Sequence, residues 1–399
     1  MVSDAHDAGH ESIPLSVPVV GGNEWAYVKE CLDTGFLAAG PMLERFEAAL
    51  RDLTGTGHAV PCASGTAALH TALLVAGVRP GDAVIVPTIT FAATVNAAVH
   101  AGAHPVFLGC DDFLNIDAEA VEAFLSQECD EGAEGPVVRG TGQPVAAIVP
   151  VHVFGAPCDM VSILDSARRH RIAVVEDAAE SMGSRWTKGP LADRHTGSVA
   201  NIGILSFNGN KIVTCGGGGA ILTNGDEAAA RVRYLIDQAK DDPIHYIHGE
   251  AGFNYRMTAT AAAIGLAQLE RLDAVMVTKR RNLGHYAERL SGLPGLSLIG
   301  TPEGTASNHW FYSLMVEPEQ AGIDRELLMA HLARQKIQTR PLWYPNHLQR
   351  AYEGAVAYRV DRAIWFWERV LNLPCSADLS PEQVDRVCDA IESALPSSA

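Results

Sequence analysis

Residues 58–87 read HAVPCASGTAALHTALLVAGVRPGDAVIVP, and they set the fold class of the chain. The apolar runs at 58–62 and 83–87 predict two strands, and the small and apolar residues at 66–76 predict a helix between them. The segment RPGD at 79–82 predicts the turn into the second strand. Strands that are apolar throughout and alternate with helices form a parallel sheet covered on both faces. This stretch therefore predicts an α/β fold.

The same alternation continues to about residue 225. Residues 126–144 are acidic and rich in glycine, so we expect a surface loop there. The other predicted elements of this region are strands at 104–108, 145–154, 172–177 and 202–207 and a helix at 159–170.

Beyond residue 225 the pattern becomes helical, with helices predicted at 227–240, 258–275 and 279–290. From about residue 295, shorter strands and helices alternate again. Strands are predicted at 296–300, 310–317 and 336–341, and helices at 325–335 and 381–395. We expect a large sheet domain over residues 1–260, and long helices leading into a small C-terminal α+β domain over residues 261–399.

Composition excludes several classes of function. The net charge of −17 argues against nucleic acid as a partner, because phosphate binding needs a basic surface. The eight cysteines show neither a CxxC pair nor a matching histidine spacing, so we expect buried thiols and no metal site. No apolar run is long enough to cross a membrane, and MVSDAHDAGHE at residues 1–11 lacks the features of a signal peptide. We expect a cytoplasmic protein.

One of the six lysines stands in a setting suited to chemistry. Lys211 follows an apolar strand and the tight segment NGN, and it precedes the four glycines of 216–219, where backbone can approach a ligand closely. A lysine amine that is partly neutral can react with an aldehyde cofactor. A surface loop lysine is the alternative for this segment alone. Lys240 and Lys279 stand beside charged residues, and we expect both at solvated helix ends.

Three further positions accompany this lysine. Asp177 ends the predicted strand 172–177, where it could keep a pyridine nitrogen protonated or simply cap the next turn. Gly65 lies between a strand and a helix, where backbone N–H groups could hold a phosphate or be capped in the ordinary way. Phe91 could stack on a flat ring or belong to the core.

Six segments occur in order along the chain: SGTAALH (64–70), PTITFAATVNA (87–97), PVHVFG (150–155), VEDAAES (175–181), SFNGNK (206–211) and GFNYRM (252–257). Together they resemble the sugar-nucleotide aminotransferases of the DegT/DnrJ/StrS family. That family lies within the fold type I, aspartate aminotransferase-like superfamily of enzymes that use pyridoxal 5'-phosphate. The resemblance extends from residues 13–18 to residues 371–376, nearly the whole chain.

The resemblance implies the pyridoxal-phosphate-dependent transferase fold, with a large, mixed but mostly parallel sheet and a small C-terminal α+β domain. It implies that Lys211 binds the cofactor as a Schiff base and that Asp177 pairs with the pyridine nitrogen. The other contacts that it implies are Gly65, Thr66 and Ser206 at the phosphate, Phe91 on the ring, Glu180 near the ring hydroxyl and Asn254 of the neighbouring subunit at the phosphate. The enzyme would therefore be a homodimer with shared active sites.

Within the family, SFNGNKIVT, QAKDDP and IQTRPLW resemble the LegC and bacillosamine-pathway type. That type implies transfer of an amino group from L-glutamate to C4 of a UDP- or GDP-linked 4-keto-6-deoxy-N-acetylhexosamine, in bacterial amino-sugar biosynthesis. The open alternatives are 3-amino transfer or 3-dehydration, a perosamine-type 4-keto-6-deoxyhexose substrate, and a regulatory protein that binds the cofactor without turnover. A nicotinamide oxidoreductase is disfavoured, because the GxGxxG fingerprint is missing.

The sequence departs from the family pattern at two places. Ala200-Asn201 stands where many members have Gly-Asp, and Glu180 stands where many have Gln. His152, His309, Trp310 and the segment 340–343 are candidates to line the sugar-nucleotide pocket, with Arg340 as a clamp for phosphate or carboxylate. For the two histidines a structural role is an equal alternative.

Overall fold

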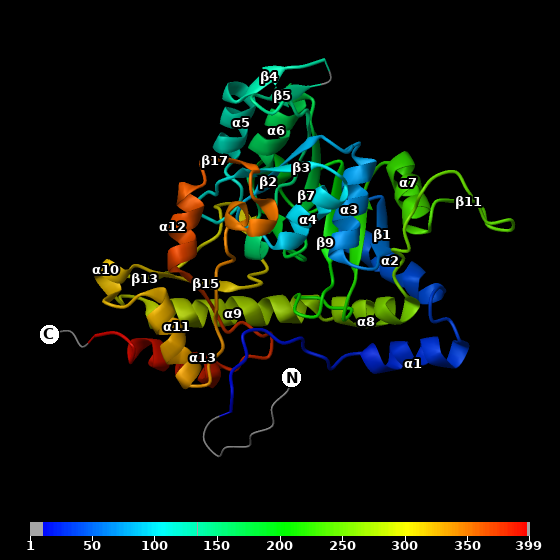
Figure 1. Ribbon diagram of the computed structural model, residues 1–399. Coiled ribbons are helices and arrows are strands. Elements are labelled where there is room, and N and C mark those ends of the chain that lie inside the picture. Colours follow the sequence, from blue (N-terminus) through cyan, green and yellow to red (C-terminus); the bar gives the residue numbers. More distant parts are fainter. Residues whose placement is uncertain (1–10, 134, 397–399) are drawn as a thin grey trace.

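The computed structural model describes residues 11–133 and 135–396, so most of the segment examined for a signal peptide lies outside the described residues. Its largest feature is an eight-stranded sheet in the order β1-β10-β9-β7-β6-β2-β3-β17 (Figure 1). The strands are β1 (His58–Cys62), β2 (Ala83–Pro87), β3 (His104–Leu108), β6 (Val145–Ile148), β7 (Ala173–Asp177), β9 (Ile202–Ser206), β10 (Gly219–Thr223) and β17 (Val356–Tyr358).

Every strand of this sheet runs in one direction except β10, which is antiparallel to both of its neighbours. The large, mostly parallel mixed sheet is the predicted one. Because parallel strands end at the same edge, the segments that follow β1, β2, β7 and β9 emerge close together. Asp177 and Ser206, at the ends of β7 and β9, therefore lie at one edge of the sheet.

Helices cover both faces of this sheet. Along β1, alternate residues pack on opposite sides, Val60 with the core under α3 (Gly65–Val75) and Ala59 with the core under α2 (Pro41–Thr54). The first face also carries α4 (Ala92–His100) and α7 (Asp226–Ile236), and the second carries α5 (Ala118–Gln127), α6 (Met160–His170) and α8 (Ala259–Leu269). The buried apolar strands thus follow from two-sided coverage.

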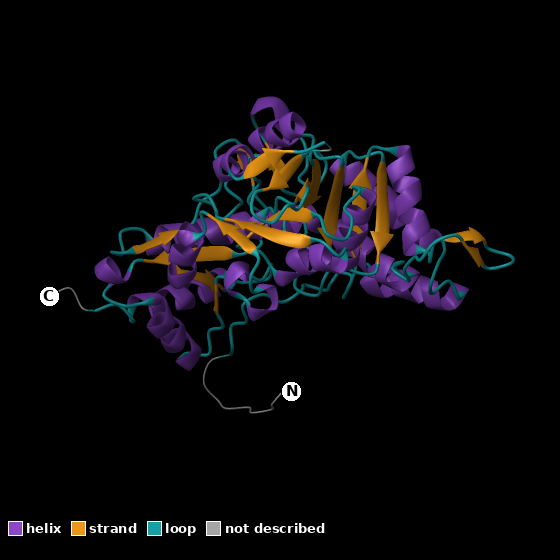
Figure 2. Ribbon diagram, turned by 45° about the horizontal axis from the view of Figure 1, so that its top comes forward, coloured by secondary structure: helices purple, strands orange, loops and turns teal. Residues whose placement is uncertain are grey.

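A smaller antiparallel sheet lies at the other end of the molecule (Figure 2). Its strands, in spatial order, are β13 (Leu296–Leu298), β15 (Tyr312–Val316), β18 (Val370–Leu373) and β16 (Arg340–Pro341). It packs with α11 (Arg325–Arg334), α13 (Pro381–Glu392) and α9 (Leu272–Leu290) around a separate apolar core. The long helix α9 continues the line of α8 and connects the two sheets (Figure 1).

Several local predictions were wrong. The predicted helix 227–240 ends at residue 236, and Lys240, expected at a helix end, begins the strand β11 (Lys240–Asp242). The expected loop 126–144 contains a short hairpin of β4 (Cys129–Glu131) and β5 (Pro136–Val138). The predicted helix 258–275 is broken at residues 270–271, and the predicted helix 279–290 is the second half of α9. The predicted strand 145–154 ends at residue 148 because Pro150 lacks a backbone donor and a 3-10 turn follows at Val153–Gly155.

The other helices and strands are α1 (Glu24–Thr34), β8 (Arg185–Trp186), β11 (Lys240–Asp242), β12 (Ile247–His248), β14 (Thr305–Ala306), α10 (Pro318–Ala321) and α12 (Asp361–Arg369). The β11–β12 hairpin projects from the large-sheet end of the molecule (Figure 1).

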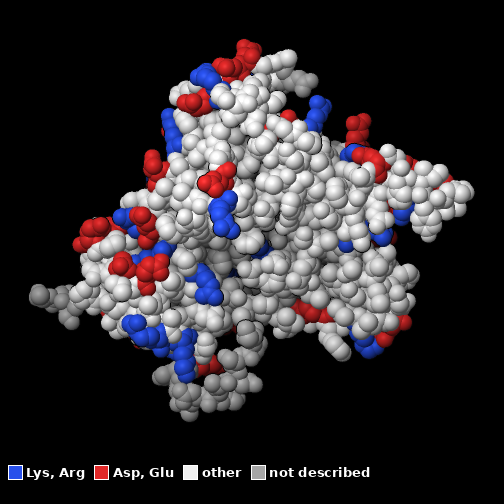
Figure 3. All heavy atoms as spheres, viewed as in Figure 1, with Lys and Arg blue, Asp and Glu red and all other residues white. Residues whose placement is uncertain are grey.

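The surface and the cysteines agree with the composition. On the face drawn in Figure 3, Lys and Arg side chains are interspersed with Asp and Glu and do not form one continuous basic patch. All eight cysteines are buried and free, as expected. Among the described residues, no helix combines the length and the apolar character needed to cross a membrane.

Candidate active site

A cavity of about 640 Å³ opens at the carboxyl ends of the large-sheet strands. Its walls also include Trp310, Arg340 and Trp343, which come from the part of the chain around the small sheet. Seven of the eight predicted site residues line this one cavity: Gly65, Thr66, Phe91, Asp177, Glu180, Ser206 and Lys211. The fold thus brings together residues that are spread over nearly 150 positions of the sequence.

Lys211 lies in the tight turn after β9, where its backbone N–H donates to the Asn208 carbonyl (2.9 Å). Its amine Nζ is 3.4 Å from Glu180 Oε1 and 3.7 Å from the centre of the Trp310 ring. Burial lowers the pKa of the Lys211 amine, while the nearby Glu180 and Asp177 carboxylates oppose that shift. A lysine held in this way is neutral part of the time and can act as a nucleophile or a base.

Asp177 is buried at the end of β7, and its carboxylate is held on both oxygens. The Ala179 N–H donates to Oδ1 (3.0 Å), and the Thr94 hydroxyl donates to Oδ2 (2.8 Å). Burial raises the pKa of Asp177, and these two hydrogen bonds lower it again. The carboxylate is therefore fixed in direction, at the floor of the cavity. Thr94 was not among the predicted site residues, although it lies one turn after Phe91, which was.

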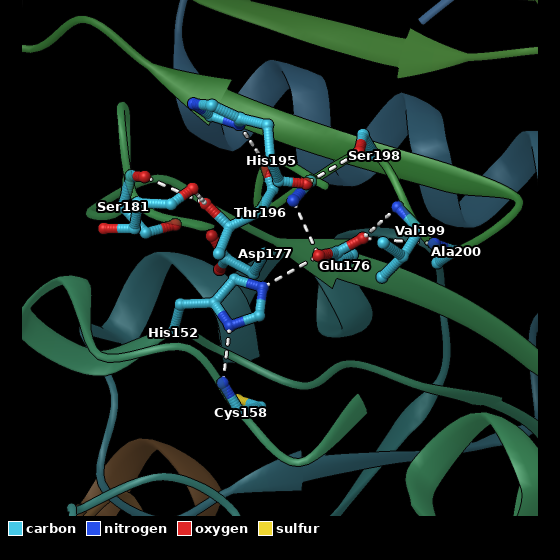
Figure 4. Close-up of polar contacts among 12 residues, drawn as sticks. His152, Cys158, Glu176, Asp177, Ser181, His195, Thr196, Ser198, Val199 and Ala200 are labelled. Carbon is cyan, nitrogen blue, oxygen red and sulfur yellow. Dashed lines mark hydrogen bonds and ion pairs between the residues drawn. The ribbon is translucent and has the colours of Figure 1, made fainter. Parts of the chain in front are cut away.

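Glu176, the preceding residue of β7, points away from the cavity into a polar cluster (Figure 4). Its carboxylate accepts hydrogen bonds from His152 Nε2 (2.9 Å) and from the N–H groups of Gly197 (2.6 Å), Val199 (3.0 Å) and Ala200 (3.1 Å). His152 Nδ1 accepts from the Cys158 N–H, so Nε2 is the ring nitrogen that donates to Glu176.

His152 therefore has a structural role and does not line the cavity, and neither does His309. Ala200-Asn201, the departure from the family pattern, lies in the same polar cluster. Ala200 contributes its backbone N–H, which donates to Glu176. It does not reach the wall of the cavity.

Glu180 faces Lys211 across the cavity floor. Its Oε2 accepts the Phe154 N–H (2.9 Å), which leaves Oε1 toward the lysine amine. Burial raises the pKa of the Glu180 carboxyl to about 7. Near neutral pH this carboxyl can therefore carry a proton, and it can donate a hydrogen bond where a glutamine would use its amide.

The N-terminus of α3 forms an anion cradle beside these groups. Ser64 caps the helix, its hydroxyl accepting from the Ala67 N–H (3.0 Å), and Ser64, Gly65 and Thr66 all face the cavity. A Cβ on Gly65 would come within 2.8 Å of the Ser206 Cβ, and one on Gly219 within 2.6 Å of the Ser64 carbonyl. Only glycine permits this close packing, which brings the N–H groups of the first turn to the cavity.

The cavity fits a phosphorylated pyridine aldehyde. The cradle suits the phosphate, Asp177 the ring nitrogen and Lys211 the aldehyde, and Phe91 is 59% exposed at the wall, where a ring can stack on it. Asn254 is the exception among the predicted residues. It pairs through its backbone with Asp237, and it does not line the cavity of its own chain.

Lys279 was wrongly expected at a solvated helix end. It lies inside α9 with 3% of its surface exposed, and its Nζ donates to the carbonyl oxygens of Trp310 (3.1 Å) and Cys375 (2.7 Å). The neighbouring arginines make the segment polar in sequence, whereas Lys279 lies on the face of α9 that is directed to the interior.

Known proteins resemble the chain over almost its full length. Residues 18–392 match the DegT/DnrJ/EryC1/StrS aminotransferase family. The chain is 36% identical over 387 residues to the GDP-perosamine synthase of Caulobacter vibrioides, covering 96% of this chain and 98% of that protein.

Two solved structures are similar as well. DesV of S. venezuelae, in complex with a ketimine intermediate, has a TM-score of 0.83 and 32% identity, covering 94% of this chain and 95% of DesV. DesI, in the presence of its TDP-sugar product, has a TM-score of 0.85 and 28% identity, covering 97% of this chain and 94% of DesI. These similarities confirm the predicted transferase fold.

Proposed function

The chain belongs to the DegT/DnrJ/EryC1/StrS aminotransferase family, and from that premise we propose that it transfers the amino group of L-glutamate to C4 of a nucleotide-linked 4-keto-6-deoxyhexose. The protein is a sugar aminotransferase that depends on pyridoxal phosphate. The observation that carries the proposal is the buried Lys211 amine, 3.4 Å from the Glu180 carboxyl and in one cavity with Asp177 and the N-terminus of α3.

Lys211 has two tasks in the proposed reaction. It would hold the cofactor covalently at rest, and once displaced by the incoming amine its Nζ would take the proton from the α-carbon of glutamate and deliver it to the cofactor carbon that had carried the lysine. When bound, pyridoxal phosphate supplies an electron sink for the negative charge that this proton transfer leaves behind. Burial lowers the pKa of the Lys211 amine, so the amine returns the proton more readily than an ordinary lysine would.

The other site residues hold and tune the cofactor. Asp177 keeps the pyridine nitrogen protonated, and Glu180 donates to the ring hydroxyl. Gly65, Thr66 and Ser206 bind the phosphate, and Phe91 covers the ring face. The proposed reaction requires no metal.

Two substrate classes fit the proposal. A GDP-linked, perosamine-type 4-keto-6-deoxyhexose is favoured, because a GDP-perosamine synthase is 36% identical to the chain. A 4-keto-6-deoxy-N-acetylhexosamine of the LegC type is the second candidate. Arg340, exposed at the cavity wall, is the side chain suited to clamp the diphosphate of either substrate.

We further propose that the enzyme works in the cytoplasm as a homodimer. Asn254 lies outside the cavity of its own chain, so its proposed contact with the phosphate requires a second subunit. The two substrates enter one site in turn, so ping-pong kinetics are expected.

The test is a screen of UDP- and GDP-linked 4-keto-6-deoxyhexoses and 4-keto-6-deoxy-N-acetylhexosamines with L-glutamate, followed by mass spectrometry of the products. Formation of a 4-amino product supports the proposal, and the preferred sugar decides between the two classes. Addition of glutamate alone should change the visible absorbance of the bound cofactor. A protein that binds the cofactor but shows neither change is a regulatory homologue, and the proposal would then be wrong.

A further inference from the structure

Trp310 is the side chain on which the Lys211 amine rests. The amine lies 3.7 Å from the centre of the indole ring, and Glu180 Oε1 lies 3.4 Å from the same amine. An aromatic face attracts an ammonium ion but cannot accept its proton. The amine is therefore held between one group that can take a proton and one that cannot.

Trp310 is held in place by hydrogen bonds from both its backbone N–H and its ring Nε1. The Trp310 backbone N–H donates to the Phe154 carbonyl (3.1 Å) and to Asn308 Oδ1 (2.9 Å), and the ring Nε1 donates to the Asn210 carbonyl (2.8 Å). Asn210 immediately precedes Lys211, so the last of these bonds couples the ring to the lysine turn. Trp310 is 4% exposed, and Phe311 stacks beside it with ring centres 4.3 Å apart.

Lys279 anchors this arrangement from behind. Its ammonium donates to the carbonyl oxygens of Trp310 (3.1 Å) and Cys375 (2.7 Å), and 3% of the residue is exposed. Burying an ammonium between two neutral carbonyls is costly in free energy. Because the ammonium bonds both carbonyls, it ties the Trp310 backbone to the segment that contains Cys375.

We infer that Trp310 is a positioning residue for the reaction, which receives and aims the Lys211 amine whenever the lysine is detached from the cofactor, and that Lys279 acts through Trp310. The inference rests on the proposed function, because only an enzyme that detaches and reattaches this lysine in each cycle needs a resting place for it. A fixed ring spares the free amine a search among rotamers before it moves the proton.

The first test uses protein without cofactor. The pH dependence of reductive methylation of Lys211 is followed by peptide mass spectrometry in the wild type, Trp310→Phe and Trp310→Leu. Charged groups around the amine are Glu180 and Asp177 at the end of β7, Arg340 on the cavity wall and Lys279 behind the indole. Loss of the aromatic face should move the midpoint of labelling in Trp310→Leu down by about one pH unit, and in Trp310→Phe by less.

Trp186→Leu is the matched control, because Trp186 is also buried, at 6% exposure, and its Nε1 also donates to a carbonyl, that of Cys158. It should lower stability but leave the Lys211 midpoint unchanged. An unchanged midpoint in folded Trp310→Leu, or an equal shift in Trp186→Leu, would overturn the inference. A wild type without aminotransferase activity would instead sink the proposed function and leave the labelling result standing.

The second test measures the single-turnover half reaction with L-glutamate. Trp310→Leu should slow it by about tenfold or more, Trp310→Phe by less, and Lys279→Met by an intermediate factor. If Lys279 acts through Trp310, adding Lys279→Met to Trp310→Leu should cost little more. If Lys279→Met slows the reaction by the same factor in both backgrounds, Lys279 acts independently of Trp310 and that part of the inference is wrong.

Discussion

Lys211, Glu180 and Asp177 are all removed from bulk water, and burial is the largest cause of the pKa shift of each. Burial lowers the pKa of the lysine and raises that of the two carboxyl groups, so it brings the amine and the carboxyls toward one another on the pH scale. Groups with converging pKa values exchange protons at a low cost in free energy. Substitutions that keep the shape of a side chain but remove its charge or hydrogen bond test this property without disturbing the packing.

Asp177→Asn should retain part of the cofactor but turn over roughly a thousandfold more slowly, because a neutral pyridine is a poor electron sink.

Thr94→Val keeps the Asp177 carboxylate and removes one hydrogen bond to it, so about a tenfold loss of turnover rate is expected. Steady-state rates and cofactor content of the purified proteins check both expectations. Near-normal turnover in Asp177→Asn would rule out the proposed role.

Glu180→Gln should remove a pH dependence from the stability of the cofactor-free protein. The pKa of Glu180 is about 7 in the folded state and 4.5 ordinarily, so the folded state binds the extra proton between these values. This contribution is fully present below pH 4.5 and lost as pH rises through about 7, and it amounts to at most about 3 kcal/mol.

Urea unfolding of both cofactor-free proteins at about pH 5 and pH 8 measures this effect, since titrating groups that do not contact Glu180 cancel in the comparison. Lys211, whose amine lies 3.4 Å from Glu180, responds to the loss of the carboxylate and is part of the measured effect. The wild type should lose stability relative to Glu180→Gln as pH rises. Parallel curves would mean that Glu180 titrates normally in the folded protein.

At the scale of elements, the site depends on how closely the start of α3 packs against the end of β9 and the start of β10. Two glycines, Gly65 and Gly219, leave room for this contact. The cradle is thus a property of three elements and not of the motif at 64–66 alone.

Gly65→Ala should weaken cofactor binding by about ten- to a hundredfold, because the new methyl group would lie 2.8 Å from the Ser206 Cβ and push α3 away from β9. Gly284→Ala is the control, since this glycine on α9 has open space around its Cβ position. The control should bind the cofactor normally and gain up to about 1 kcal/mol of stability. Cofactor titration by fluorescence distinguishes the two, and normal affinity in Gly65→Ala would contradict the proposed cradle.

At the scale of the whole molecule, one chain supplies the cavity but leaves Asn254 outside it. A dimer in which each subunit lends its Asn254 to the other would complete both phosphate sites. Such sharing makes activity a property of the pair of chains, which subunit exchange can test.

Mixing Lys211→Ala with Asn254→Ala under subunit exchange should restore activity to about a quarter of the wild-type level. Half of the dimers are then mixed, and one of their two sites carries both residues. Mixing Lys211→Ala with Asp177→Asn should restore nothing, because these residues line the cavity of the same chain. If exchange is verified by mass spectrometry and the first mixture stays inactive, Asn254 acts within its own subunit.

Local patterns in the sequence already indicate the sheet and the edge at which several site residues meet. Apolar strands alternating with helices require a parallel sheet, and parallel strands end at one edge, so Gly65, Asp177 and Lys211 could be placed together from the sequence, whereas Ser206 came only from the family resemblance. Their local signals, a glycine, a strand end and a lysine after a strand, lie within a few residues of each position. Local pattern and chain direction sufficed for this part of the site.

Tertiary structure alone decided which side chains meet across the cavity. Thr94 and Asp177 are separated by 83 positions, and Trp310 and Asn210 by 100, so no local pattern links them. The burial of Lys279 likewise depends on two carbonyls from distant segments, which is why its charged neighbours suggested a solvated position. The periodicity of a sequence shows on which face of its helix or strand a residue lies. The residue that it contacts across the cavity depends on how elements from distant parts of the chain pack together.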